Sequence, residues 1–398
     1  MDVRDAAPSD LATWDARAVD GPGGSVWQSR AWGEHAARNG WRTRHLIDAA
    51  GFPLLVLLRP WPAIGGASAY LPRGPVAAGD APARIVERLV GVTERLGADG
   101  VDVLATDAEI ALESGYADLL RGAGFAPIEE IQPSRHRMAV SLHGDEAAAW
   151  EGIARKTRQR IGSAHRRGLV VRRLDVRDAA PGGGAGAAEV GRGAIGLGAI
   201  EPTVARPSAA QLEAAASAAF GPFHALLEAT GTRRGFAIGS RAGSAAWWLA
   251  ALRAGHLVYL EIRDTPPGDD WSAPRGTLLG GAIFFRQGGR ITYGHSGDRP
   301  EMRAAHPGVV HLLLWEAMRI ALAEGASELD LGGVDVAGAR GIPAEGDPMW
   351  GLYEFKRAFG GAWVEMAGAH ERVIRPRRYA AGRAVAALAR RLPGGGRD

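Results

Sequence analysis

The chain has 398 residues, of which 46% are hydrophobic and 23% charged, with a formal net charge of +3. This length predicts two domains, each large enough to bury its own core. The chain contains no cysteine, which excludes disulfide bonds, thiolate metal sites and a cysteine nucleophile, and which is typical of proteins from a reducing compartment.

No apolar signal-peptide core opens the chain, and no run reaches the roughly 18 apolar residues that a membrane span requires. We therefore expect a cytoplasmic protein without stable membrane insertion, either free or at the inner face of the plasma membrane. The small positive charge permits a polyanionic partner such as tRNA. Because the 11 histidines are scattered without carboxylates at ligand spacing, no metal site is predicted.

The first third of the chain alternates predicted strands and helices. Apolar periodicity and turn residues predict a short helix within 25–41, strands at 52–59 and 69–76, a helix at 82–96, a strand at 101–105, a helix ending near 120, and strands at 126–132 and 135–142. Arg73 lies at the glycine-bearing turn of LPRGPV, and Asp107 follows the strand at 101–105. Polar residues at the end of a buried strand commonly face a ligand site, so both are candidates.

The segment RGAGFA, from Arg121 to Ala126, matches the pyrophosphate-loop pattern of acetyl-CoA enzymes. Such a loop binds phosphate where it opens a helix, because free N–H groups lie at the helix N-terminus. Here the glycines are predicted to end a helix. We therefore expect no acetyl-CoA site at this segment.

A strongly basic helix is predicted to begin at Asp145. Between Arg155 and Arg167 it holds Lys156, Arg160 and further arginines, with few acidic residues to neutralise them. Such a helix is either a solvated face or a phosphate-binding ridge. In the second case Lys156 and Arg160 are the candidates for binding tRNA or phosphate.

The rest of the chain repeats the order of elements seen in the first third. After a Gly/Ala-rich insertion at about 176–200, we predict helices at 209–230 and 242–253, strands at 256–263, 280–286 and 290–293, a helix from Val309, a strand at 329–331 and a helix that carries Lys356. A glycine-bearing turn (LPRGPV; TYGHSG), a helix, a strand (VDVLATD; ELDLGGVD), a second helix and a glycine stop occur in both parts. This repetition predicts two copies of one α/β unit with a cleft between them.

Lysine is almost absent from the chain. Only Lys156 and Lys356 occur among 47 basic residues. Lysine carries a compact, strongly hydrated charge on a flexible stem, whereas arginine presents a planar fork. In a sequence that replaces lysine with arginine elsewhere, a retained lysine indicates a position that requires a point charge. Lys356, between Phe355 and Phe359, is the stronger candidate, because a solvated helix face would explain Lys156 equally well.

The chain resembles the Fem-type (FemA/FemB/FemX) peptidoglycan-bridge aminoacyltransferases, in the form without the helical-hairpin insertion. The likeness rests on WQSRAW, YLPRGPV, the basic helix KTRQRIGSAHRRG, the block LLLWEAMRIALAEGASELDLGGVD and, above all, YEFKRAFGG. It implies an α/β (α+β) fold of two tandem acetyltransferase-like (GNAT-type) domains with a cleft between them. The first would comprise residues 1–145 plus 368–398, and the second residues 146–367.

The resemblance implies a tRNA-dependent enzyme of cell-wall synthesis. Members of the family move an amino acid from aminoacyl-tRNA onto the stem-peptide side-chain amine of a UDP- or lipid-linked muramyl peptide, and so build interpeptide bridges. Aminoacyl-tRNA is a co-substrate, and no other cofactor is implied. We expect a monomer.

The resemblance also assigns roles to residues. The family's oxyanion-stabilising lysine falls on Lys356, and its carboxylate near the attacking amine falls on Asp107. Arg241 and Tyr293 fall on positions that meet the phosphates and the muramyl peptide of the precursor. Arg73 and Phe355 are the further substrate-binding candidates.

Two positions depart from the family pattern. Ala36 stands where members can carry a phosphate-binding lysine, with His35 and Arg38 as substitutes, and Asp102 stands where a tyrosine is expected. Two alternative functions therefore stay open. One is a tRNA- or acyl-CoA-dependent N-acyltransferase acting on another amine, such as a peptide natural product. The other is a catalytically silent protein that binds tRNA or a wall precursor.

Overall fold

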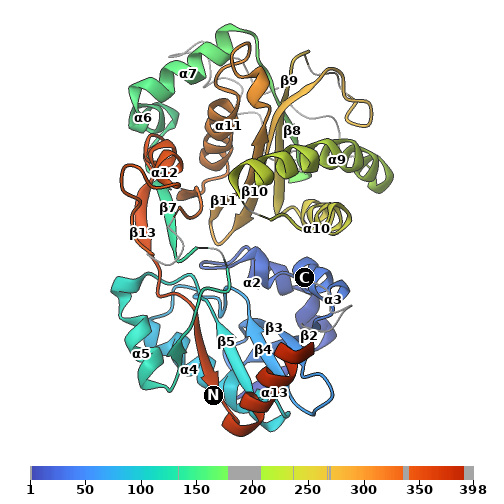
Figure 1. Ribbon diagram of the computed structural model, residues 1–398, viewed down its shortest axis with the longest axis vertical. Coiled ribbons are helices and arrows are strands. Elements are labelled where there is room, and N and C mark those ends of the chain that lie inside the picture. Colours follow the sequence, from blue (N-terminus) through green and yellow to red (C-terminus); the bar gives the residue numbers. More distant parts are fainter. Residues whose placement is uncertain are drawn as a thin grey trace.

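The computed structural model describes residues 2–132, 134–177, 208–235, 237–266, 268, 270–334 and 340–389. Within these ranges the chain forms two seven-stranded sheets flanked by helices, which lie one above the other along the long axis of the molecule (Figure 1). This arrangement confirms the predicted fold class of two tandem α/β units. Most of the predicted Gly/Ala-rich insertion at 176–200 falls outside the described residues.

The first sheet has the strand order β1-β2-β3-β4-β5-β14-β6. Its strands are β1 (Val3–Asp5), β2 (Arg42–Asp48), β3 (Pro53–Pro60), β4 (Ala67–Leu71), β5 (Val103–Thr106), β6 (Ala126–Pro127) and β14 (His370–Val373). Strands β4 and β5 pair in parallel, and α4 (Pro82–Ala98) connects them. Helix α4 buries Ile85, Leu89, Val92 and Leu96 at helical spacing in the core under this sheet, as its periodicity predicts.

The second sheet has the strand order β13-β7-β12-β11-β10-β9-β8. Its strands are β7 (His136–Ser141), β8 (Val171–Leu174), β9 (Leu257–Arg263), β10 (Leu278–Gln287), β11 (Arg290–Asp298), β12 (Glu328–Asp330) and β13 (Ala362–Glu365). Strands β11 and β12 are again a parallel pair, and α11 (Val309–Ala323) connects them. The two sheets therefore share one topology, which is what the repeated motifs predict.

The two units exchange one strand with each other. Strand β7 directly follows β6 in the chain, yet it pairs with β12 and β13 of the second sheet. Strand β14 follows β13, yet it returns to pair with β5 and β6 of the first sheet. Each sheet is thus completed by a strand that follows the other unit in sequence. Neither sheet has all its strands without the other half of the chain.

The domain boundaries stay a prediction. Strand β7 falls within residues 1–145 but lies in the second sheet, whereas β14 falls within residues 368–398 and lies in the first. We propose that a division by sheets places the first boundary before His136.

The remaining helices cover the faces of both sheets (Figure 1). They are α1 (Pro8–Ala12), α2 (Trp14–Ala18), α3 (Arg30–Arg38), α5 (Tyr116–Gly122), α6 (Glu146–Gly152), α7 (Arg155–Arg166), α9 (Ala209–Arg234), α10 (Arg241–Arg253), α12 (Trp350–Arg357) and α13 (Pro376–Ala389). Across the ranges described, no helix combines the length and apolarity needed to cross a bilayer.

The predicted basic helix from Asp145 is two helices. Asp145 caps α6 by accepting from the N–H of Ala148, as expected for an N-cap residue. The chain then turns at Ile153, and α7 starts where the N–H of Ala154 donates to the carbonyl oxygen of Ala358 at 2.8 Å. This tertiary hydrogen bond, which the periodicity did not reveal, fixes the start of α7 to the end of α12.

The predicted strand at 126–132 is also shorter than expected. Only Ala126 and Pro127 pair, with β14, and the chain then leaves the sheet. Here the partner strand is itself short, so apolar pattern alone overestimated the length.

One hydrophobic core joins the two units. It contains Trp14, Val26 and Leu55 from the first unit together with Phe220 of α9 and Trp247 of α10 from the second. Since burial of apolar area stabilises in proportion to the area removed from water, separating the units would expose this core. The shared core therefore fixes how the ends of the two parallel strand pairs face each other.

Candidate functional site

The parallel strand pairs of the two sheets end at corresponding places. Pairing of β4 with β5 ends at Leu71 and Thr106, and Asp107 follows. Pairing of β11 with β12 ends at Thr292 and Asp330. In α/β sheets the carboxyl ends of parallel strands are the usual place for ligands. Both units therefore direct such an end toward the junction between them.

A β-bulge aims Tyr293. The register of β10 and β11 passes from Ile283 opposite His295 to Phe284 opposite Tyr293, so Gly294 is the extra residue. A side chain at Gly294 would collide with the ring of Phe285, which explains the glycine. Bulges re-aim side chains beside functional sites. This one places the Tyr293 ring next to the ammonium of Lys356, with Nζ 5.8 Å from the ring centroid.

Lys356 projects from α12 into the interior. The residue is only 4% exposed, and Nζ donates to the carbonyl oxygen of Gly333 at 3.0 Å. Gly333 is its one hydrogen-bond acceptor among the described residues, so two of the three N–H donors of an ammonium stay available. Nothing bulky stands at Gly332, where an added Cβ would lie 3.6 Å from Nζ.

Burial and a nearby carboxylate shift the pKa of this ammonium in opposite directions. Burial lowers the pKa of Lys356 to about 8, and attraction to Asp330 partly offsets that effect. Most of the lysine is therefore protonated at neutral pH. A buried ammonium with free donors stabilises negative charge that develops on a nearby oxygen more strongly than it would in water.

Asp107 is held by two donors of the first unit. Its Oδ1 accepts from the backbone N–H of Arg73 at 2.7 Å, and its Oδ2 accepts from the hydroxyl of Tyr70 at 2.9 Å. Gln132 in turn donates to the Tyr70 hydroxyl at 3.3 Å. Burial raises the pKa of the Asp107 carboxyl above its usual range, against the effect of Arg73. The carboxylate is thus fixed in orientation and more basic than an exposed one.

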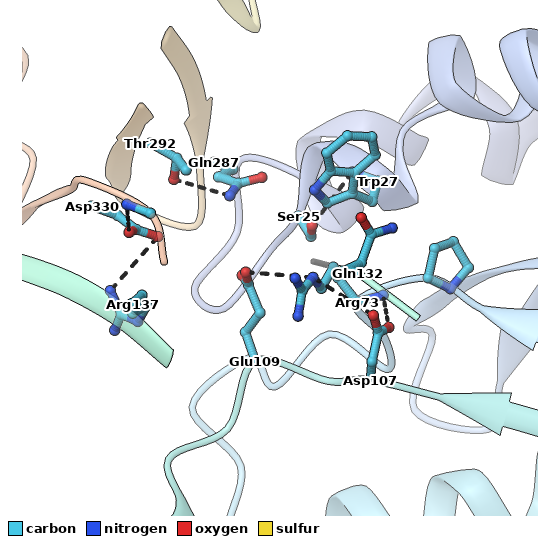
Figure 2. Close-up of polar contacts among 12 residues, drawn as sticks. Ser25, Trp27, Arg73, Asp107, Glu109, Gln132, Arg137, Gln287, Thr292 and Asp330 are labelled. Atoms are coloured by element: carbon cyan, nitrogen blue, oxygen red, sulfur yellow. Dashed lines mark hydrogen bonds and ion pairs between the residues drawn. The ribbon is translucent and has the colours of Figure 1, made fainter. Parts of the chain in front are cut away.

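A chain of alternating charges links Asp107 to the second unit. Figure 2 shows its first members, Asp107, Arg73 and Glu109. Arg73 Nε lies 3.7 Å from Asp107 and 3.8 Å from Glu109. Glu109 accepts a hydrogen bond from Arg290, and Arg290 Nε lies 3.9 Å from Asp330. Asp330 is the carboxylate that attracts the Lys356 ammonium. The two predicted catalytic residues are therefore joined electrostatically across the junction.

Sequence analysis missed the inner members of this chain. Glu109 and Arg290 are 181 positions apart, and no local pattern connects them. Asp330 could have been found, because it lies in the predicted strand at 329–331, which repeats the strand at 101–105 that Asp107 follows. The contact of Tyr70 with Asp107 could not have been found, because a residue inside the predicted strand at 69–76 gives no sign of which side chain it meets.

The other candidates of the second unit lie around α12. Phe355 packs edge-on against His311, with ring centroids 5.1 Å apart. A nitrogen of Arg160 lies 3.2 Å from Nε2 of His311, so α7 is linked through His311 to Phe355, the neighbour of Lys356 in sequence. Burial, together with Arg160, lowers the pKa of His311 to about 4, which makes a neutral imidazole the form present at pH 7. Lys156 is exposed in the first turn of α7.

Arg241 is not brought to Lys356. It is an exposed residue at the start of α10, and its guanidinium lies over Gly221 of α9. Residues of α9 and α10 belong to the core on one face of the second sheet, whereas α11 and α12 pack on the other. No contact joins Arg241 to Lys356 or Tyr293 in the part of the chain that is described, so its role stays a prediction.

Within the described ranges, no three histidine, aspartate or glutamate side chains are placed to share a metal ion. The charged groups at the junction are instead paired with arginines. The arrangement is suited to binding an amine and an ester and to stabilising charge between them.

Comparison with known proteins gives a family match in the last third of the chain and a structural match over nearly all of it. Residues 272–387 match the FemAB family, and this range includes Tyr293, Asp330 and Lys356. No curated protein matches the sequence. The chain is similar in structure to a protein described as FemX, with a TM-score of 0.70 and 16% sequence identity, over 96% of this chain and 99% of that one.

Two further solved structures are more distant. One is L-PGS from Bacillus licheniformis (TM-score 0.46, 9% identity, 97% of this chain and 96% of that chain). The other is a tandem GNAT protein from the clavulanic acid biosynthesis pathway (TM-score 0.43, 13% identity, 94% and 98%). At these scores neither adds to the argument. The chain therefore matches the FemAB family in sequence over residues 272–387 and shares the fold of the FemX structure over nearly its whole length.

Proposed function

We propose that the protein transfers an amino acid from aminoacyl-tRNA to the stem-peptide side-chain amine of a UDP- or lipid-linked peptidoglycan precursor, as in the formation of interpeptide bridges. The observation that carries this proposal is the buried ammonium of Lys356, which keeps free donors at the end of the β11–β12 pair. The match of residues 272–387 to the FemAB family supports the donor, and the resemblance of the site motifs supports the acceptor.

In the proposed reaction the acceptor amine attacks the ester carbonyl of the aminoacyl group. A C–N bond forms, the C–O bond to the terminal ribose breaks, and a proton passes from the amine to the departing ribose oxygen. Negative charge appears on the carbonyl oxygen only in between, so an ammonium beside that oxygen lowers the barrier. We assign this role to Lys356.

Asp107 is assigned to the acceptor amine. Its carboxylate can accept a hydrogen bond from the amine and hold the nitrogen lone pair toward the ester. Its raised pKa makes it a better proton acceptor than an exposed aspartate, although proton transfer to the leaving oxygen needs no permanent base. Tyr70 and the backbone of Arg73 keep the carboxylate in place.

We assign α7 to the tRNA. Lys156 and Arg160 lie on α7, whose N-cap residue Ala154 donates its N–H to the carbonyl oxygen of Ala358. Ala358 follows Lys356 by two residues, so the start of α7 lies next to the end of the lysine's own helix. Phosphate contacts from lysine and arginine position a nucleic acid without specifying its sequence. The helix would hold the acceptor end of the tRNA while the ester reaches Lys356.

An acyl-CoA-dependent reaction has less support. Helix α5 ends at Gly122, and Gly124 follows in a left-handed conformation with φ of 82°. The RGAGFA segment thus lies at the carboxyl end of a helix, which presents carbonyl groups, whereas a phosphate is bound by the free N–H groups of a helix N-terminus.

Transfer should depend on intact tRNA. We expect the purified chain, mixed with a charged-tRNA pool and muramyl peptides, to add an amino acid to the peptide, as measured by mass spectrometry. RNase treatment of the pool before mixing should abolish the product. Transfer from acyl-CoA that survives RNase would refute the proposal in favour of an acyl-CoA enzyme.

Lys356→Met should separate catalysis from stability. We expect kcat to fall by about 10²- to 10³-fold, the usual effect of losing one oxyanion donor. Because burial depresses the pKa of Lys356, removing the charge should leave the free energy of unfolding unchanged or raise it by about 1–3 kcal/mol. Chemical denaturation and single-turnover kinetics measure the two quantities.

The matched control for that variant is Arg84→Met, at an exposed position of α4, which should change neither quantity. A folded Lys356→Met protein with normal kcat would remove Lys356 from the mechanism. Strong destabilisation would instead assign it a structural role.

The pH dependence of kcat should distinguish an ammonium from a base. With a pKa of about 8, Lys356 is charged below that pH and loses its charge above it. We expect kcat to decline above pH 8 if the ammonium acts, and to rise through pH 8 if neutral lysine were the base. In Lys356→Arg the residual activity should lose this alkaline limb, because arginine stays protonated. Spontaneous ester hydrolysis is subtracted with a blank.

Lys156→Gln should weaken tRNA binding. We expect a several-fold rise in KM for aminoacyl-tRNA, with kcat unchanged, and a salt dependence of binding reduced by about one phosphate contact. Arg84→Gln on α4 serves as the control for nonspecific charge. An unchanged salt slope would mean that Lys156 meets no phosphate.

A further inference from the structure

Buried arginines of this protein fall into two kinds. Arg88 represents the first, with Nε donating to Asp48 at 2.6 Å, Nη2 to Asp80 at 2.7 Å and Nη1 to the carbonyl oxygen of Val76 at 3.0 Å. All three nitrogens of this guanidinium are satisfied, as a structural role requires. Arg286 is of the same kind, with hydrogen bonds from each nitrogen.

Arg73 is of the second kind. Its side chain is 14% exposed, and its guanidinium donates no hydrogen bond to any residue in the described ranges. Its contacts with Asp107 and Glu109, at 3.7 and 3.8 Å, are too long for hydrogen bonds. Nε is fully covered and still without an acceptor. A largely buried guanidinium with unused donors is costly unless a ligand supplies the acceptors.

The orientation of Arg73 leaves its fork open. Nε makes the contacts with both carboxylates, so the terminal nitrogens, which carry four of the five N–H donors, are not the atoms that Asp107 and Glu109 engage. The backbone of Arg73 has φ of +48°, a left-handed conformation that side-chain-bearing residues seldom adopt. Such strain persists where the surroundings enforce it, often at ligand sites. Here the bond from the Arg73 N–H to Asp107 enforces it.

We propose that Arg73 binds a carboxylate of the acceptor, and that the acceptor amine and this carboxylate sit on the same carbon atom. A guanidinium fork matches a carboxylate with two parallel hydrogen bonds. Asp107 takes the ammonium or amine beside it. Since Arg73 and Asp107 are within 4 Å of each other, one ligand reaches both only if its amine and carboxylate are separated by very few bonds. A side chain ending in an α-amino acid group has this form.

The carboxylate belongs to the acceptor rather than to the tRNA. Arg73 and Asp107 both come from the strand ends of the first sheet, whereas Lys356 and the basic helix α7 come from the second unit. This inference rests on the proposed function for the identity of the reaction, but the recognition of an amine next to a carboxylate does not depend on the donor.

The test uses three muramyl tripeptides as acceptors. They end in diaminopimelate, in diaminopimelate whose side-chain carboxylate is an amide, and in lysine. For the full chain with charged tRNA we expect kcat/KM for the free carboxylate to exceed that of the amide and of lysine by about 10- to 100-fold, the range of a charge-assisted hydrogen-bond pair.

Variants at Arg73 identify the recognising group. In Arg73→Gln the preference should shrink to within about threefold, while transfer to the amide changes little, and Arg73→Lys should recover part of the preference. Arg84→Gln, an exposed arginine of α4, should retain all of it. An equal loss for all three acceptors would mean a structural role, and a rise in KM for aminoacyl-tRNA alone would mean that Arg73 meets a phosphate; either result overturns the inference.

Binding separates this inference from the proposed function. If none of the acceptors is a substrate, the inference is tested by binding alone. The protein is titrated calorimetrically, without tRNA, with the diaminopimelate peptide and with its amide. Tighter binding of the free carboxylate that is lost in Arg73→Gln would support the inference while the transferase proposal fails. Equal transfer to carboxylate and amide by the unmodified protein would overturn the inference while the transferase proposal stands.

Discussion

The structure depends on how one positive charge is kept inside the protein. Lys356 is 4% exposed, and isolated charges are strongly disfavoured in such surroundings. Asp330 supplies the balancing charge at a distance, while the Lys356 ammonium donates to the carbonyl oxygen of Gly333 and Asp330 Oδ1 accepts from the N–H of Gly332. The ammonium therefore remains charged near neutral pH, yet its donors stay free for a substrate oxygen. A direct salt bridge would have stabilised the charged lysine more, but it would have left fewer N–H donors free for a substrate oxygen.

The exchange of strands makes this arrangement possible. Strand β7 follows the first unit in sequence but lies next to β12, and β14 follows the second unit but lies next to β5. The neighbours of both strand ends at the junction are thus supplied by the opposite half of the chain. Together with the shared core and the Glu109–Arg290 pair, they hold Asp107 and Lys356 in a fixed relation, as preorganised catalysis requires.

The sequence predicted the parts of the fold that depend on local pattern. Helix α4, the paired strand ends and the repetition of the two units follow from periodicity and turn residues. The break between α6 and α7 depends on a hydrogen bond to Ala358, and the destination of β7 depends on competition between two sheets, so neither could be derived locally. The same holds for the site. Lys356 and Asp107 stand in recognisable motifs, whereas Glu109 and Arg290 become partners only through the packing of the units.

The position of the two lysines bears on why they were retained. Lys356 is two residues before Ala358, whose carbonyl oxygen accepts from Ala154, and Lys156 is two residues after Ala154. The only two lysines of an arginine-rich chain thus flank one hydrogen bond, although 200 positions separate them in sequence. Two lysines retained by chance at unrelated positions would not be expected to lie next to the same hydrogen bond. Lys156 is exposed to solvent, whereas Lys356 is buried. This arrangement fits the proposed binding of one extended ligand, whose phosphates would meet Lys156 and whose reactive ester would meet Lys356.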